Sequence, residues 1–154
     1  MNSALEIVVN NKDNECNIDA TKTYTTMQAA KICGVSQGTI YKLFDRGYLK
    51  GFKVPLSGYR KILGNSLIKF IKKNGIDEYL GEKIYTTGKS AKICRIGTKT
   101  IIRYFDNKML KGYRITGTSY RFIPRKCLIE FMKENGMYEY LKDNLCLKDN
   151  PNEV

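Results

Sequence analysis

The side chains best equipped for chemistry in this chain are its lysines and arginines. They number 27 against 15 Asp and Glu residues, which gives a formal net charge of +12. Fixed positive charge in this excess favours polyanionic partners, of which nucleic acid is the commonest and an anionic membrane surface the weaker alternative. Part of the excess also fits a composition rich in Lys, Asn, Ile and Tyr, with lysines that are simply solvated.

The positive charge is concentrated in two segments. Residues 24–80 carry a net charge of about +7 and residues 85–141 one of about +8, whereas residues 1–23 and 142–154 are slightly acidic. The excess therefore belongs to the two segments, and we expect a polyanion to bind there.

Residues suited to catalysis or metal binding are scarce. The chain has no histidine, and its five cysteines form no CxxC pair, so a zinc site of the usual spacing is excluded. A phosphate-binding glycine loop and paired carboxylates are also missing, and Asp45 and Asp106 resemble capping or salt-bridge residues at helix ends. We expect no enzyme, no metal and no cofactor, and a core role for Cys33 and Cys94.

The two basic segments are one sequence written twice. Residues 24–80 align with residues 85–141 without a gap, and roughly 26 of about 57 positions are identical. The predicted organisation is a flexible segment 1–23, a first copy 24–80, a linker 81–84, a second copy 85–141 and a flexible tail 142–154. Each copy is near the lower size limit for an independent core.

Each copy opens with the pattern of two short helices. Thr25 or Thr26 can cap a helix that runs from residue 27 to about residue 33, and Gly34 is a natural stop. Ser36 then caps a second helix, on which Ile40 and Phe44 share one face. Two short helices joined by so tight a turn predict a helix-turn-helix. The second copy repeats the pattern, with Arg95 at the position of the glycine stop and Ile101 and Phe105 on the shared face.

The rest of each copy predicts a β-hairpin and a third helix. Residues 49–54 and 59–62 are two short strand-like runs around a Pro-Leu-Ser-Gly turn, and residues 65–74 have apolar residues at helical spacing before Gly75. In the second copy Pro124 is well placed to start the third helix. The predicted fold class is mainly α with short β-hairpin wings (α+β), as two tandem winged helix-turn-helix domains.

These motifs carry a resemblance to a known family. The string YTTMQAAKICGVSQGTIYKLFDRGYLKGFKV, followed by GYRKI, resembles the DNA-binding domain of the MerR superfamily. It is most similar to the small excisionase-type and BldC-like winged helix-turn-helix proteins of bacteria and phages, and YTTGKSAKICRIGTKTIIRYFDNKMLKGYRI with SYRFIPRKCLIEFM resembles them too. The resemblance implies double-stranded DNA as the partner, and no small-molecule effector is expected because effector-binding domains are absent.

In this family the second helix enters the major groove with its first turns toward base edges. By position these residues are Ser36, Gln37, Gly38, Thr39, Tyr41 and Lys42 in the first copy, and Thr98, Lys99, Thr100, Ile102 and Arg103 in the second. Gln37 suits adenine, Lys99 or Arg103 suits guanine, and Ile102 suits a thymine methyl. Positions 37, 38, 41 and 42 all differ from their counterparts, which predicts two different half-sites.

The hairpins place cations and tyrosines where a wing meets the phosphate backbone or the minor groove. These residues are Lys53, Tyr59, Arg60 and Lys61, and in the second copy Arg114, Tyr120 and Arg121. The tyrosines could instead pack within the hairpin, and the arginines could be a solvated face. The pairs Ile40 with Phe44 and Ile101 with Phe105 are expected in the core.

The pattern as a whole predicts a sequence-specific DNA-binding protein, either a transcription regulator or an excisionase-like recombination factor. Two other interpretations stay open: an architectural, filament-forming DNA-coating protein, and an interaction module that docks a recombination, replication or phage partner. A linker of about four residues reaches only roughly 14 Å, so we expect the two units to lie close together. The resemblance to BldC-like proteins implies a head-to-tail arrangement, with an inverted one as the alternative. With no long apolar run, a cytoplasmic, nucleoid-associated protein is expected.

Overall fold

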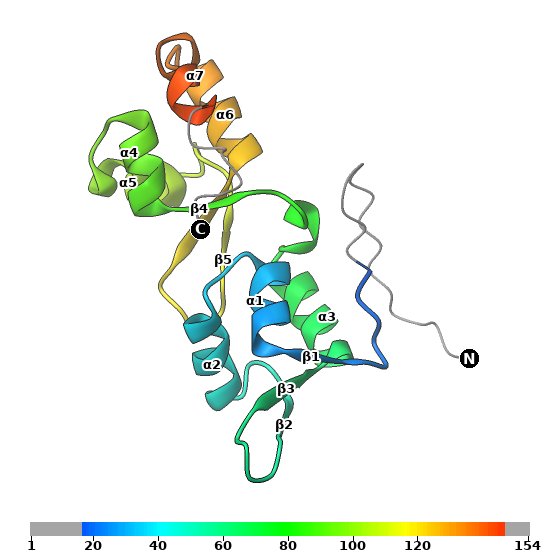
Figure 1. Ribbon diagram of the computed structural model, residues 1–154. Helices are drawn as coiled ribbons and strands as arrows, with labels where there is room; N and C mark the ends of the chain where they lie inside the picture. The colour runs from blue at the N-terminus through cyan, green and yellow to red at the C-terminus, as the bar shows by residue number, and fades with distance from the viewer. Residues whose placement is uncertain (1–16, 147–154) are drawn as a thin grey trace. The chain divides into compact units, whose positions relative to one another are not determined.

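The computed structural model describes residues 17–146 (Figure 1). By their internal contacts these residues fall into two compact units. Unit 1 runs to Gly81 and includes Ile115–Ser119, and unit 2 comprises Glu82–Arg114 and the chain from Tyr120 onward. Each unit is described by itself below.

Unit 1 contains three helices, a short 3-10 helix and one small sheet. In chain order the elements are β1 (Thr23–Thr25), α1 (Thr26–Cys33), α2 (Gln37–Asp45), β2 (Gly51–Lys53), β3 (Arg60–Leu63), α3 (Gly64–Lys73) and η1 (Asp77–Tyr79). The three strands are antiparallel, with β3 in the middle between β1 and β2. The hairpin of β2 and β3 extends from the unit as an arm (Figure 1).

Unit 2 repeats this order of elements and ends in a helix. The elements are β4 (Ile84–Thr86), α4 (Thr87–Cys94), α5 (Thr98–Asp106), β5 (Tyr113–Arg114), β6 (Arg121–Pro124), α6 (Arg125–Glu134) and α7 (Tyr138–Cys146). The sheet again has its last strand in the middle, in the order β4-β6-β5. The result is a mixed α and β structure, as the fold class predicted. The last helix runs past residue 141, where a flexible tail was expected to begin.

The sequence pattern did not reveal the first strand of either sheet. Tyr24 pairs with Ile62 and Tyr85 pairs with Ile123, so each sheet has three strands instead of the two of a simple hairpin. A run of three residues directly before a helix is too short to show strand alternation. In each unit the extra strand pairs with the central strand of the sheet and leads directly into the first helix, α1 or α4. It therefore connects the hairpin to the helices.

Hydroxyl side chains cap α1 and α2, as predicted, and Thr86 caps α4 in the same way. The Thr25 hydroxyl oxygen accepts a hydrogen bond from the Gln28 backbone amide, and the Thr25 backbone amide donates one to the side-chain oxygen of Gln28, which completes a capping box. Ser36 caps α2 by accepting from the Thr39 amide. At the start of α5, Gly97 provides no side-chain cap.

The first helix of each unit ends in a left-handed residue, although only one of the two is glycine. Gly34 has a φ of 68° and Arg95 a φ of 54°. In both, the cap amide points back to carbonyls of the last turn, so the backbone path is the same. An arginine adopts this conformation at a cost, because its Cβ crowds the backbone there.

Each unit has its own apolar core. Ile40 and Ile101 are fully buried, as expected, whereas their helix partners Phe44 and Phe105 are only partly buried. The predicted core role of Cys33 and Cys94 is confirmed, since both are almost fully buried. Burial raises the pKa of the Cys94 thiol to about 11, which keeps it protonated at neutral pH.

A repeated glycine permits the close approach of the hairpin strands. A Cβ on Gly51 would lie 1.8 Å from the Lys61 carbonyl oxygen, and a Cβ on Gly112 would lie 2.3 Å from that of Phe122. No side chain fits at either position, which explains why both copies have glycine there. Within the described residues, no helix combines the length and the apolar character needed to cross a membrane.

The left-handed cap of α4 leads to a prediction about stability. Replacing Arg95 by Gly should raise the free energy of unfolding by about 0.5–1 kcal/mol, because glycine takes this conformation without steric cost while losing more freedom on folding. The reciprocal change Gly34→Arg should lower it by a similar amount. Urea unfolding measures both, and a lower midpoint for Arg95→Gly would contradict the explanation.

Candidate nucleic-acid interface

The first turns of α2 present a mostly polar, solvent-facing surface. Ser36, Gly38, Tyr41 and Lys42 are exposed and Gln37 is partly buried, so these predicted groove-facing residues lie on one side of the helix start. Thr39 differs, because it is only 8% exposed and its hydroxyl lies 2.9 Å from that of Ser36. Its side chain thus supports the helix start and faces away from solvent.

The exposed side chains of α2 are joined by hydrogen bonds. The side-chain amide of Gln37 donates to the hydroxyl of Thr26 at 2.8 Å and to that of Tyr41 at 3.2 Å. The side-chain carbonyl oxygen of Gln37 can accept a further hydrogen bond. Because the amide nitrogen is already bonded to two hydroxyls, the orientation of this oxygen is set before a partner binds.

The β2–β3 hairpin is tied to the end of α2 by an ion pair. Arg60 donates through Nε to Asp45 Oδ1 at 3.0 Å and through Nη2 to Asp45 Oδ2 at 2.9 Å. The guanidinium also lies 4.8 Å from the centre of the Tyr41 ring. This bidentate geometry sets the direction of the guanidinium, so a residue of the β2–β3 hairpin and a residue of α2 are placed together.

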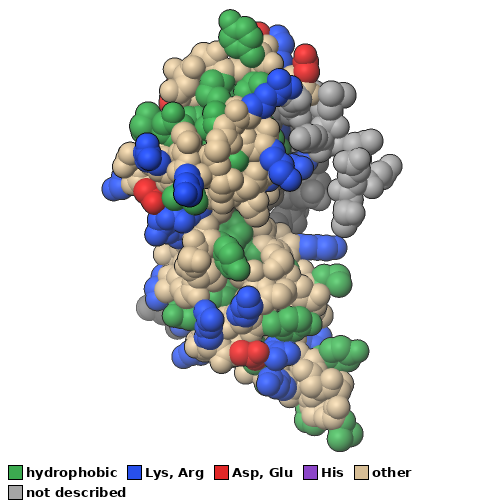
Figure 2. Space-filling view, turned by 90° about the vertical axis from the view of Figure 1, so that its left-hand side faces the viewer, with side chains coloured by type: hydrophobic (Ala, Val, Ile, Leu, Met, Phe, Trp, Pro, Cys, Tyr) green, Lys and Arg blue, Asp and Glu red, His purple; other side chains and the backbone are tan. Residues whose placement is uncertain are grey.

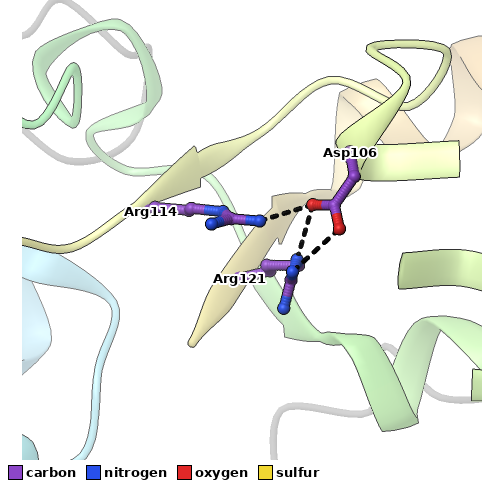
Figure 3. A network of polar contacts seen from close by, with 3 residues as sticks. All are labelled: Asp106, Arg114 and Arg121. Carbon is purple, nitrogen blue, oxygen red and sulfur yellow. Dashed lines mark hydrogen bonds and ion pairs between the residues drawn. The ribbon is translucent and has the colours of Figure 1, made fainter. Parts of the chain in front are cut away.

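Unit 2 has the same pair at the equivalent positions (Figure 3). Arg121 donates to the two carboxylate oxygens of Asp106 at 3.0 and 2.9 Å, and Arg114 donates to the same carboxylate from the neighbouring strand. Asp106 therefore receives arginines from both strands of its hairpin. At the position of Arg114 unit 1 has Lys53, which acts on Asp45 only through its charge.

These contacts change the acidity of both aspartates. The hydrogen bonds from Arg60 hold the pKa of Asp45 below its ordinary value of 3.8. The Arg121 hydrogen bonds, with those of Arg114, do the same for the pKa of Asp106. Both carboxylates stay charged at neutral pH and balance part of the positive charge beside α2 and α5.

The other predicted residues lie on the same elements. On α5, Thr98, Lys99 and Arg103 are exposed, whereas Thr100 and Ile102 are partly buried. On the hairpins, Lys53 and Tyr59 are exposed and Lys61 is partly buried. Tyr120 packs edge-on against Phe122, with ring centres 6.5 Å apart, which agrees with the alternative that this tyrosine packs within its hairpin. Tyr59 is exposed and shows no such ring contact among those described.

The sequence predicted only part of the role of Asp45 and Asp106. A salt bridge was one expectation, but the partners of the two aspartates are the hairpin arginines Arg60 and Arg121 and not neighbours on the helix. The signal was present in the repeat, because both the aspartate and the arginine are identical in the two copies at the same spacing. Two residues conserved together between copies can mark a contact across the fold.

One view of the surface shows basic side chains over both units, with acidic ones sparse between them (Figure 2). Among the described residues no group of three or more Cys, Asp or Glu side chains is arranged to hold a metal ion. The exposed side chains at the start of α2 and α5 include the cations of Lys42, Lys99 and Arg103 and the hydroxyls of Tyr41 and Thr98, groups that can bind phosphates and base edges.

A protein-family model described as "Helix-turn-helix domain" matches residues 23–75, which span β1 to the end of α3. The match supports a helix-turn-helix DNA-binding domain over this part of the chain. No curated protein and no solved structure matches the chain.

The lowered pKa values predict how stability depends on pH. Both aspartates titrate below 3.8 in the folded state, so their pairs stabilise the fold fully above that value and lose this contribution as the pH falls through the lowered pKa. We expect Asp45→Asn with Asp106→Asn to lower the urea midpoint at about pH 7, and the difference from the parent to shrink at about pH 2.5.

The control is Asp77→Asn, which removes an exposed carboxylate of η1 outside both pairs. A difference between parent and double variant that is the same size at both pH values would contradict the assignment.

Proposed function

We propose that this protein binds double-stranded DNA sequence-specifically and without catalysis, through two tandem winged helix-turn-helix units. In this proposal α2 and α5 enter major grooves, and the β2–β3 and β5–β6 hairpins act as wings on the phosphate backbone or in the minor groove. The observation that carries the proposal is the arginine pair, Arg60 and Arg121, that joins each hairpin to the helix expected to read bases.

The paired arginines are suited to phosphate contacts. A guanidinium has five N–H donors, and Arg60 uses two of them on Asp45, which leaves three for another acceptor. Because the bidentate pair already holds the side chain, a phosphate contact costs little further conformational entropy. An arginine that binds the aspartate of the helix and a DNA phosphate at the same time would fix the distance between that helix and the DNA backbone.

The two units are proposed to read different sequences. Gln37 and Tyr41 form a hydrogen-bonded pair on α2, and α5 has Thr98 and Ile102 in their places. The amide of Gln37 and the phenol of Tyr41 can form hydrogen bonds with base edges, whereas the isoleucine side chain can make apolar contact with a thymine methyl group. Two modules in one chain also raise the effective concentration of the second for its half-site, so that two weak sites together give a strong one.

The process served by such binding is proposed to be transcription regulation or excisionase-like recombination. This rests on the resemblance of the motifs to MerR-like, excisionase-type and BldC-like proteins, and on the family match to unit 1. Footprinting separates this role from DNA coating, since a discrete protected site supports it and protection that spreads without limit supports a filament.

Salt dependence tests the proposal. If the hairpins and helices make six or more phosphate contacts, the dissociation constant for a mixed-sequence 40-bp duplex should rise by a factor of about 1,000 or more between 50 and 200 mM salt. Arg60→Ala with Arg121→Ala should weaken binding and flatten this dependence by about two units of log–log slope.

The matched control removes the same charge at another repeated position. Lys72 and Lys133 lie in the last turns of α3 and α6, and Lys72→Ala with Lys133→Ala should change binding much less than the arginine pair does. Binding that does not respond to salt, or an equal loss in both double variants, would contradict the proposed interface.

A further inference from the structure

The tip of the β2–β3 hairpin presents one apolar side chain fully to solvent. Leu56 is 110% exposed, the largest value among the exposed apolar side chains of the described residues. It stands in the turn Pro55-Leu56-Ser57-Gly58, at the outer end of the arm in Figure 1. In the space-filling view, hydrophobic side chains are visible at the end of this projection (Figure 2).

The backbone under Leu56 is held in an unfavourable conformation. Its φ is 67°, in the left-handed region where glycine or asparagine is preferred and a branched apolar residue is not. Three backbone hydrogen bonds close the turn: Val54 to the Tyr59 carbonyl, Gly58 to the Val54 carbonyl, and Ser57 to the Pro55 carbonyl. The tip is thus a closed loop that projects leucine at a conformational cost.

The aligned position in the other hairpin is a useful comparison. Gly117 occupies it, with a φ of 86°, in the turn Thr-Gly-Thr-Ser. Both turns therefore use a left-handed residue at this point, and glycine meets that need without strain. Leucine in the first turn is not required by the backbone, which leaves its side chain as the reason for its presence.

The chemistry around the tip indicates a polyanion as the partner. Lys53 and Arg60 are the paired residues nearest the turn of the hairpin, and Lys61 pairs with Phe52 one step further from the tip. Tyr59, 72% exposed, lies beside the turn. Cations and aromatic rings under an apolar tip match a DNA minor groove, where apolar side chains can enter between base pairs and unstack them.

We propose that Leu56 is a wedge that enters the minor groove and kinks the duplex at the half-site of unit 1. This extends the proposed function, on which it rests, from reading DNA to bending it. Insertion favours pyrimidine–purine steps, because these unstack most readily. The β5–β6 hairpin, with Gly117 in place of a leucine, contributes no kink, so the bend is confined to one half of the site.

The test uses the full chain with a 30-bp duplex recovered from a random pool by selection for binding. 2-Aminopurine replaces adenine at each position in turn, since its fluorescence rises when it is unstacked, and end-to-end energy transfer reports the bend. The parent protein should raise the fluorescence at one or two neighbouring positions. Leu56→Met should keep this signal, and Leu56→Asn should lose both the fluorescence rise and the bend.

Asparagine makes the loss interpretable, because it tolerates the left-handed conformation and should not lower the urea midpoint. If the parent protein binds the duplex without raising the 2-aminopurine fluorescence, or if Leu56→Asn raises it equally, the proposal that Leu56 is a wedge is wrong, while the proposal of DNA binding is unaffected. If the wedge is instead a docking point for a protein, Leu56→Asn leaves the DNA geometry unchanged, which also overturns it. Failure of the parent to select any duplex contradicts the proposed function itself.

Discussion

The arrangement of both units depends on a bidentate pair between an aspartate that ends a helix and an arginine in a hairpin strand. Asp45 is the last residue of α2 and Asp106 the last residue of α5. A carboxylate is electrostatically unfavourable there, because the carboxyl end of a helix carries partial negative charge. Both copies keep it, and in both an arginine from the hairpin compensates for it. Exposed ion pairs add only modestly to the free energy of unfolding, so the main value of this one is geometric.

The geometry matters because the hairpins are short. A two-stranded hairpin of three and four residues is marginal by itself in water. The strands β1 and β4 hold it at one edge, and the arginine pair ties it to the second helix. In the proposed function, a hairpin and a helix already held together would contact DNA at two places with a smaller entropy cost than two independently ordered elements.

Local signals in the sequence predicted most of the helices, and longer-range contacts account for what was missed. The caps at Thr25 and Ser36 depend on residues a few positions away, so their pattern is visible in the sequence. The strand β1 exists only through its pairing with β3, which no local pattern shows. Arg95 adopts the conformation of Gly34 because the surrounding unit requires the same turn, and tertiary structure overrides the local preference. In the candidate site the sequence indicated Gln37, Tyr41 and Arg60 as separate contacts, whereas the structure joins them through a hydrogen bond and a cation–π contact.

The central claim is that two units of the same fold bind different DNA sequences through different residues on α2 and α5. Selection of binding sites from a random DNA pool tests this claim most directly. The full chain should select a motif of two unequal half-sites at a fixed spacing. A chain in which α2 is given the groove-facing residues of α5, with Gln37→Thr, Gly38→Lys, Tyr41→Ile and Lys42→Arg, should select two similar half-sites instead. The same motif from both chains, or a motif with a single half-site, would contradict the account.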